Sequence, residues 1–255
     1  MSPNDSPELR IKHLEEQVRQ YRDSVVRGLN QLLDLRDINT GCHSTRLAEW
    51  AVRVAVDFGL DEDDQNNVEV ACLLHDIGKV GVPDKILGKR GALTETERAE
   101  MNRHPEYGWA ILRSFPGLQS ASLYALHHHE RFDGKGYPGG LKGDQIPLGA
   151  RIVTVVDAFD AMVSDRCYRS GLSLEIALER LMRDSGKQFD PEIVEPFVRM
   201  ADSTAVMVSY GNPIVHRATN GAPAPMARRH RSNGSSRLPY GVVVDRSSAG
   251  VVGET

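Results

Sequence analysis

Histidines and acids recur along this 255-residue chain at positions that could together bind metal ions. A histidine and an aspartate are adjacent in LLHDIGK, and three consecutive histidines precede a glutamate in HHHE. Imidazole and carboxylate ligands suit Fe, Mn, Co or Ni, and a carboxylate can bridge two ions. Seven such ligands exceed one tetrahedral zinc site and suit two octahedral ions. The candidate ligands are His43, His75, Asp76, His104, Asp157 and two of the three neighbours His127, His128 and His129.

Basic residues close to these candidates in the sequence could bind an anionic substrate. Lys79 follows the His-Asp pair, and its charge would suit either a substrate phosphate or a helix C-terminus, two roles that can hold together. Arg166 and Arg169 are three residues apart, so one helix face would present both to phosphate. The alternative for this pair is a solvated helix surface.

Residues 132–149 contain six glycines and two prolines, which predict a structured loop, with a short hairpin as one form of it. Glycine allows tight turns and a close approach of backbone to a ligand. Tyr137 in this loop could stack on a purine or pack the loop, and we favour packing.

Helical patterning surrounds these segments. A long helix is predicted over residues 8–36, because apolar residues recur there at spacings of three and four. This stripe is close to a heptad seam, so the helix could pack on its own domain, form a parallel dimer contact, or transmit a signal from a sensor. The stripe consists of Leu14, Val18, Tyr21, Val25, Leu29 and Leu32.

The rest of the patterned region is also helical. Asp61 and Thr94 are predicted N-caps, the latter in a capping box with Glu97. There is no βαβ alternation and no GxGxxG after a strand, which disfavours a nucleotide-binding α/β fold. One mainly α domain is expected from residue 38 to 205. The predicted helices are 43–58, 61 to the turn at Gly78, one opening at 94, 105–114, 118–129, 149–166, 173–185 and 191–202.

The composition, 40% hydrophobic and 26% charged, excludes collagen-like, mucin-like and fully disordered chains. No apolar run approaches the roughly 18–20 residues of a membrane span. The polar segment Met1–Arg10 is not a secretory signal. Three cysteines without a CxxC pair favour a reducing compartment, so we expect a cytoplasmic protein.

The formal net charge of −4 conceals a basic C-terminal segment. Residues 211–255 hold six arginines and two acids, and are rich in Pro, Gly and Ser. We expect residues 206–255 to form a disordered tail after an N-terminal helix and linker (1–37) and a catalytic domain (38–205). Such a tail could contact nucleic acid or anionic lipid, but a solvated extension is favoured.

Three long segments, in the same order, resemble the HD-GYP family of metal-dependent phosphodiesterases. They are HDIGKVGVPDKIL, HHERFDGKGYPGGLKGDQIP and RIVTVVDAFDAMVSDRCYR, within about residues 35–200. His75-Asp76 matches the HD pair, and Gly136-Tyr137-Pro138 matches the GYP triplet. The resemblance implies an all-α fold: an HD-domain helical bundle with a Gly/Pro-rich GYP loop, here preceded by the long N-terminal helix. It also implies hydrolysis of cyclic di-GMP to linear pGpG, with GMP left open as a final product.

The resemblance also implies roles for individual residues. Ligands shared with simpler HD phosphohydrolases match His43, His75, Asp76 and Asp157. Ligands of a second ion match His104, His128 and His129, with Asp76 as the bridge. Positions near the substrate match Lys79 at the scissile phosphate, Arg166 and Arg169 at the phosphates, and Gly134 and Tyr137 in the loop beside the site.

One position departs from the family pattern. Some members have a glutamate four residues before the first ligand histidine, where this chain has Asn39, a weaker ligand for a divalent cation. We therefore expect two divalent ions, Fe or Mn, since a third would need another carboxylate, with Asp37 the nearest. A hydroxide bridging the two ions would attack phosphorus, while the metals and Lys79 offset the phosphoryl charge.

Alternative functions remain open from the sequence. The chain could hydrolyse another cyclic dinucleotide, or act as a signalling scaffold through protein–protein contacts. The expected partners are cyclic di-GMP, a second copy of the chain through residues 8–36, and a signalling protein.

Overall fold

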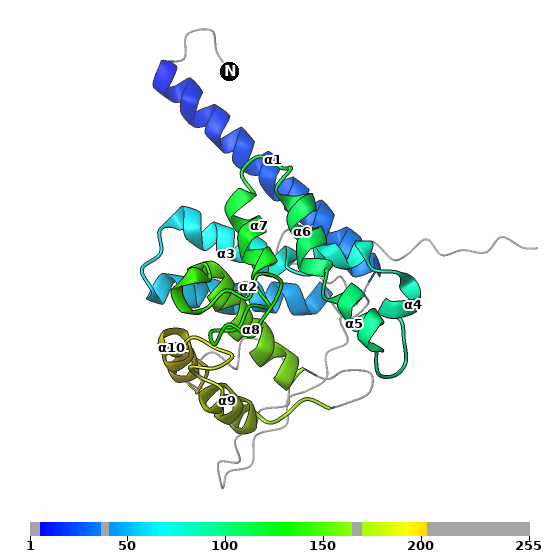
Figure 1. The fold of residues 1–255 in the computed structure, drawn as a ribbon. Coiled ribbons are helices and arrows are strands. Elements are labelled where there is room, and N and C mark those ends of the chain that lie inside the picture. Colours follow the sequence, from blue (N-terminus) through cyan, green and yellow to red (C-terminus); the bar gives the residue numbers. More distant parts are fainter. Residues whose placement is uncertain (1–5, 37–40, 165–169, 203–255) are drawn as a thin grey trace, which may run out of the picture. The chain divides into compact units, whose positions relative to one another are not determined.

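The computed structural model describes residues 6–36, 41–164 and 170–202. These residues form α-helices and two short 3-10 helices, with no β-strand among them, so the expected all-α class is confirmed (Figure 1). The elements are α1 (Pro7–Arg36), α2 (Gly41–Asp57), α3 (Glu62–Leu74), η1 (Ile77–Gly81), α4 (Asp84–Leu87), α5 (Glu95–Met101), α6 (His104–Leu112), α7 (Gln119–Leu126), η2 (Gly143–Gln145), α8 (Leu148–Val163), α9 (Leu174–Arg183) and α10 (Pro191–Asp202).

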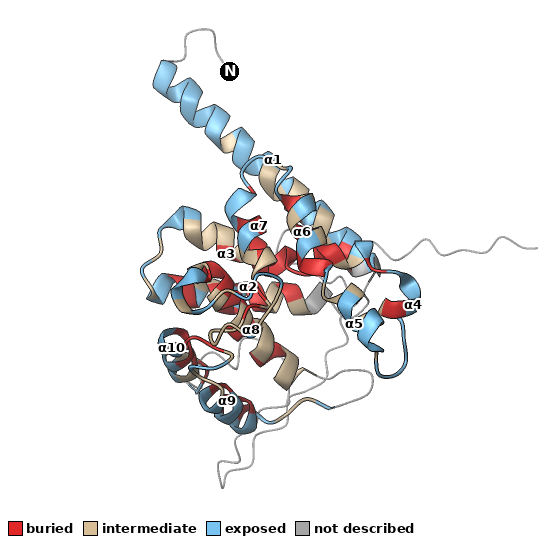
Figure 2. Ribbon diagram, viewed as in Figure 1, coloured by how far each residue is buried: buried red, intermediate tan, exposed pale blue. Residues whose placement is uncertain are grey.

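The core lies where α2, α3 and α8 pack together, with α10 against α2 and α8. Trp50, Phe159 and Phe197 meet there, with ring centroids 5.0 to 5.9 Å apart in tilted or edge-on geometry. All three side chains are buried, as Figure 2 shows for the helices that carry them. This packing fixes α2 and α8 against each other, and each of these helices carries candidate metal ligands.

The helix starts agree with the capping residues expected from the sequence. The Asp61 carboxylate accepts a hydrogen bond from the Asp64 N–H, 2.8 Å away, at the start of α3. At α5, the Glu97 side chain accepts from the Thr94 N–H (2.8 Å), and the Thr94 hydroxyl accepts from the Glu97 N–H (3.3 Å). The predicted capping box is therefore confirmed.

Three helices end three or more residues earlier than expected, and one of them is α8, which was predicted over 149–166 and ends at Val163. The helix predicted to run to Gly78 ends at Leu74 and is followed by η1, and the helix predicted over 118–129 ends at Leu126. The candidate ligands near these ends therefore lie on turns. Residues 132–149 contain η2 and no strand, so the hairpin considered for this loop is not formed.

The helix α1 has two different environments along its length. Its C-terminal half packs on α2, α3 and η1, where Val26 and Leu33 are buried (Figure 2). The N-terminal half extends beyond the other helices, and Leu14, Val18 and Tyr21 are each more than half exposed (Figure 1). Packing on its own domain therefore uses Val26, Leu33 and, from the apolar stripe noted in the sequence, Leu29, and it leaves Leu14, Val18, Tyr21 and Leu32 exposed.

No helix in the described ranges is both long enough and apolar enough to cross a membrane. Asp37, Asn39, Arg166, Arg169 and the basic segment 206–255 lie outside these ranges.

Candidate metal centre

Seven candidate ligands from five parts of the chain lie close together in the structure. They come from α2, the end of α3, the start of α6, the turn after α7 and the middle of α8. Within each of three overlapping groups, one ligand atom per residue lies within 4.8 Å of the others. The groups are His43, His75 and Asp157; His75, Asp76 and His128; and His104, His128 and His129.

Three of the histidines are oriented by the ends of the preceding helices. His75 Nδ1 bonds to the carbonyl of Cys72 (2.8 Å), His104 Nδ1 to that of Met101 (2.8 Å), and His128 Nδ1 to that of Ala125 (2.6 Å). These carbonyls belong to the last turns of α3, α5 and α7, where backbone acceptors have no helical partner. Each ring therefore satisfies a helix terminus and is fixed by it.

This bonding also determines which ring nitrogen is left for a metal. A carbonyl only accepts, so each Nδ1 carries the proton, and Nε2 of the neutral ring has the lone pair. His104 Nε2 and His128 Nε2 face each other at 3.4 Å. Two lone pairs at that distance repel unless a cation lies between or beside them, so the donor set fits a bound metal ion.

Asp76 lies between the histidines. Its Oδ1 is 3.3 Å from His104 Nε2, and its Oδ2 is 3.4 Å from His75 Nε2. One carboxylate thus faces a ring from each of two groups, which is the arrangement that a bridging ligand requires. Burial alone would raise the pKa of Asp76, but Lys79 and His75 hold it well below the ordinary value, so the carboxylate is ionised.

His43 is held by a carboxylate instead of a carbonyl. Its Nδ1 bonds to Asp160, and its Nε2 lies 3.3 Å from Asp157 Oδ1. Asp160 is buried, and it also accepts from Arg46 Nε and from the Ser164 hydroxyl, 3.0 Å away. Asp160 of α8 thereby links to His43 and Arg46 of α2, on the side of His43 away from Asp157.

The protonation of the ligands follows from these surroundings. Burial disfavours the charged ring of His43, but hydrogen bonds to Asp157 and Asp160 outweigh it and raise its pKa to about 9. Burial, together with the charge of His104, lowers the pKa of His129 to about 4. Burial also lowers the pKa of His128 well below its ordinary value. At neutral pH, His128 and His129 are therefore neutral, the form that binds metals.

Lys79 stands beside the ligands on η1. Its Nζ lies 2.6 Å from Asp76 Oδ2, so the ammonium is fixed at the edge of the cluster. Gly78 makes this possible, because a Cβ at this position would lie 1.8 Å from the His104 carbonyl oxygen and 2.4 Å from the Gly108 nitrogen. Only glycine lets η1 lie against α6, which brings Asp76 and His104 together.

The GYP loop packs on the turn that carries His128 and His129. A Cβ at Gly136 would lie 2.3 Å from the Arg131 nitrogen, so the loop and turn backbones are in contact. The buried Glu130 accepts from the N–H groups of Gly139 (2.6 Å) and Leu141 (3.1 Å). Tyr137 lies against the His129 ring, with centroids 4.9 Å apart and planes 31° from parallel. The Tyr137 ring therefore packs against a candidate ligand.

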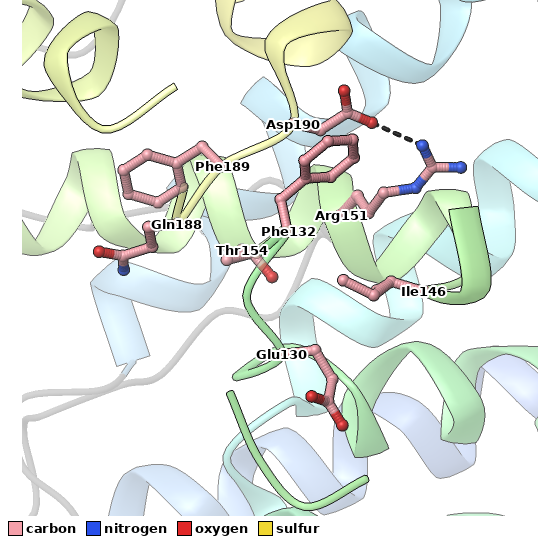
Figure 3. A pocket seen from close by; sticks show the side chains of 8 residues that line it. All are labelled: Glu130, Phe132, Ile146, Arg151, Thr154, Gln188, Phe189 and Asp190. Atoms are coloured by element: carbon pink, nitrogen blue, oxygen red, sulfur yellow. Dashed lines mark hydrogen bonds and ion pairs between the residues drawn. The ribbon is translucent and has the colours of Figure 1, made fainter. Parts of the chain in front are cut away.

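A small pocket lies behind this loop, and none of the seven candidate ligands lines it (Figure 3). Arg151 of α8 forms an ion pair there with Asp190, at 2.6 Å, just before α10 begins. The ion pair links α8 to the residue that precedes α10. The lining residues are Glu130, Phe132, Ile146, Arg151, Thr154, Gln188, Phe189 and Asp190.

The sequence-based site residues fall into three sets. The seven candidate ligands and Lys79 lie together in the cluster described above. Gly134 and Tyr137 lie in the GYP loop, where Gly134 has a φ of +81°, which turns the loop, and the Tyr137 ring lies against His129. The structure does not describe Arg166 and Arg169.

Asp160 and Glu130 have site roles that the sequence reasoning missed. A signal was present for each: Asp160 lies one helical turn after Asp157 in an otherwise apolar helix, and Glu130 directly follows the three histidines. A buried acid in such a place needs a partner, and here the partners are a ligand histidine and the loop backbone.

Comparison with known proteins agrees with this geometry. A family model described as HD domain matches residues 27–193. The chain is 42% identical, over 74% of its length and 53% of the relative's, to a cyclic di-GMP phosphodiesterase of Thermotoga maritima. It is 39% identical to the cyclic di-GMP phosphodiesterase response regulator RpfG of Xanthomonas campestris (76% and 52%). It is also 39% identical to 3'3'-cGAMP-specific phosphodiesterase 2 of Vibrio cholerae (70% and 34%). The chain spans about half the length, or less, of these curated relatives.

Solved structures share the fold. The cyclic GMP-AMP-specific phosphodiesterase V-cGAP3 of V. cholerae aligns with a TM-score of 0.56 at 20% identity, over 74% of this chain and 50% of that one. The HD domain of the Listeria monocytogenes phosphodiesterase PgpH aligns with a TM-score of 0.53 at 21% identity, over 71% and 99%. The arrangement of helices and the matched residues together show that the chain belongs to the HD-domain family, in its HD-GYP branch.

Proposed function

We propose that the chain hydrolyses a phosphodiester bond of cyclic di-GMP to give linear pGpG. The observation that carries the proposal is the meeting of the Nε2 atoms of His75, His104 and His128 around Asp76, beside an intact GYP loop. The names of the similar proteins, cyclic di-GMP phosphodiesterases at 42% and 39% identity, support this substrate.

The seven candidate ligands would hold two divalent ions, of Fe or Mn, with Asp76 shared between them. Such ions act as Lewis acids on a phosphoryl oxygen and lower the pKa of water toward neutrality. The chain's own residues orient and charge the site: the histidine rings are fixed by helix ends, and Lys79 places an ammonium beside Asp76 to meet a phosphate oxygen. Arg166 and Arg169 are proposed to bind the phosphates.

Turnover and metal content test this proposal together. The protein is loaded with Mn²⁺ or Fe²⁺, its metal content is measured by elemental analysis, and products from cyclic di-GMP are separated by mass spectrometry. We expect about two metal ions per chain and pGpG as product. His75→Ala should abolish turnover. His127→Ala is the matched control, because His127 belongs to none of the three ligand groups. A metal-loaded protein that leaves cyclic di-GMP intact contradicts the proposal.

A second candidate substrate is 3'3'-cGAMP, because one similar protein is named for its specificity for that dinucleotide. Side-by-side assays with equal concentrations of both dinucleotides distinguish the two. Faster cleavage of cyclic di-GMP supports the first proposal, and faster cleavage of 3'3'-cGAMP supports the second.

Further parts of the proposal concern the cell. We propose a cytoplasmic enzyme, a location that fractionation of cells expressing the tagged chain tests, and a signalling-protein partner. A protein that binds metal and partners without hydrolysing any cyclic dinucleotide would instead be a scaffold.

A further inference from the structure

The exposed face of α1 carries a heptad pattern that is longer than the stripe first visible in the sequence and has one non-apolar position, Gly28. From Ile11 to Leu35, the spacing between successive residues of this pattern alternates between three and four. Six of the eight side chains are more than half exposed, Gly28 is exposed, and Val25 is partly covered. In heptad notation, the a positions are Ile11, Val18, Val25 and Leu32, and the d positions are Leu14, Tyr21, Gly28 and Leu35.

The face by which α1 packs on its own domain is a different one. Val26, Leu29 and Leu33 form that contact, as buried or partly buried members of the core. At 100° per residue, the centre of this face lies roughly a quarter turn or slightly more from the centre of the heptad seam. Both faces can therefore be occupied at once, and packing on the domain leaves the seam open.

We propose that α1 forms a parallel, in-register, two-stranded coiled coil with a second copy of this chain. Three of the four a positions are the β-branched residues Ile11, Val18 and Val25, and two d positions are leucine. β-Branched residues at a with leucine at d favour two parallel strands over three or four. The seam from Ile11 to Leu35 covers about three and a half heptads, within the three to four heptads that indicate a coiled coil.

Charges beside the seam complement each other in this arrangement. In a parallel in-register pair, a residue at g lies beside the residue at e five positions later in the other helix. Arg10 is at g and Glu15 is at e, so each Arg10 would face the Glu15 of the other helix, and the dimer would hold two such pairs. The next such pair, Gln17 with Arg22, has no like charges. An antiparallel pair brings g beside g and e beside e, which loses the Arg10–Glu15 attraction.

Mass measurement of the 255-residue chain tests the dimer. Sedimentation over a concentration series should give a dimer for the parent, and monomer at the same concentrations for Val18→Asp, which places two carboxylates in the seam. His13→Asp adds the same charge on the exposed side of α1 away from the seam and should remain dimeric. A parent that is monomeric throughout, or a Val18→Asp variant that stays dimeric, overturns the proposal. Circular dichroism checks that each variant keeps its helices.

Cross-linking and charge exchange test the register. Leu14→Cys should form a disulfide-linked dimer on mild oxidation, because d residues face each other in a parallel pair. Glu16→Cys, on the outer face, should link no more than the parent does. Arg10→Glu and Glu15→Arg should each weaken the dimer, and the double variant should restore it. A dimer in which Leu14→Cys fails to cross-link, or in which the double variant is weaker than both single variants, overturns the parallel arrangement.

None of these measurements uses hydrolysis. A failure of the proposed phosphodiesterase activity therefore leaves the dimer test valid, and a monomeric result leaves the activity untouched.

Discussion

His43 differs from the other candidate ligands in what orients it. His75, His104 and His128 bond to backbone carbonyls, whereas His43 Nδ1 bonds to the buried Asp160. A carboxylate behind a histidine fixes the ring and makes its other nitrogen a stronger metal ligand. Asp160 is therefore a positioning residue that acts through His43.

Replacing Asp160 by asparagine should weaken metal binding through His43. The amide keeps an acceptor oxygen but loses the charge that Arg46 and His43 share. Loss of such an outer partner typically costs about 10–100-fold in metal affinity. Competition titration against a chelating dye measures the affinity directly. Asp144→Asn is the control, because the Asp144 side chain is 93% exposed. An Asp160→Asn variant that folds and binds metal as tightly as the parent would exclude this role.

The ligand types could be predicted from the sequence, but their orientation could not. A histidine next to an aspartate suggests metal binding wherever it occurs, while the bond from His75 to the Cys72 carbonyl depends on α3 ending at Leu74. Apolar periodicity continues in the sequence past Leu74 and does not indicate that the helix ends there. Asp160 was missed because its spacing from Asp157 shows that the two acids share a face of the helix but not that Asp160 bonds to His43 on another helix.

At the scale of elements, close backbone contacts set the spacing of the site. The 3-10 turn η1 lies against α6 only because Gly78 has no side chain. The turn carries Lys79 and directly follows Asp76, while α6 begins with His104. One glycine therefore controls the distance between two candidate ligand groups.

Gly78→Ala should push η1 away from α6 and disturb both stability and metal binding. The added methyl group would collide with backbone atoms, which cannot rotate away. Overpacking of this kind costs about 1–3 kcal/mol or more. Thermal unfolding and metal content of the purified variant would report both effects.

Gly28→Ala is the matched control for this substitution. Nothing lies within 4 Å of a Cβ built at Gly28 in α1, and alanine favours a helix interior over glycine by about 0.5–1 kcal/mol. This variant should unfold at the same temperature as the parent or slightly higher. Equal effects of the two substitutions would contradict the contact assigned to Gly78.

The sequence predicted the existence of α1 but not which of its faces would pack. Apolar residues occupy both the heptad seam and the positions of Val26 and Leu33, so a pattern of spacing alone allows either face to be buried. Tertiary packing decides the choice, because α2, α3 and η1 meet α1 through Val26 and Leu33.

At the scale of the molecule, the candidate ligands join segments that are distant in the sequence. A cation shared by His43, His75 and Asp157 would tie together α2, the end of α3 and α8. A second one would add α6 and the turn after α7. Bound metal should therefore stabilise the whole described domain, and not the site alone.

Removing the metal should lower the unfolding temperature. A ligand present at a hundred times its Kd stabilises the folded state by about 2.7 kcal/mol, or about 5–10 °C for a domain of this size. Scanning fluorimetry of metal-loaded protein with and without a chelator measures the difference. His75→Ala should show little response to the chelator. An unchanged unfolding temperature for the parent would show that the ions, if bound, do not link these helices.

The histidines that cap helix ends have a consequence for the entropy of metal binding. Ordering a flexible side chain on binding typically costs about 0.5–1.5 kcal/mol. The rings of His75, His104 and His128 are already restrained by the carbonyls of Cys72, Met101 and Ala125. Most of the side-chain conformational entropy of these three ligands is therefore lost when the chain folds, and not when the ion binds. A metal ion then meets a preorganised set of lone pairs, and more of its coordination energy remains as affinity.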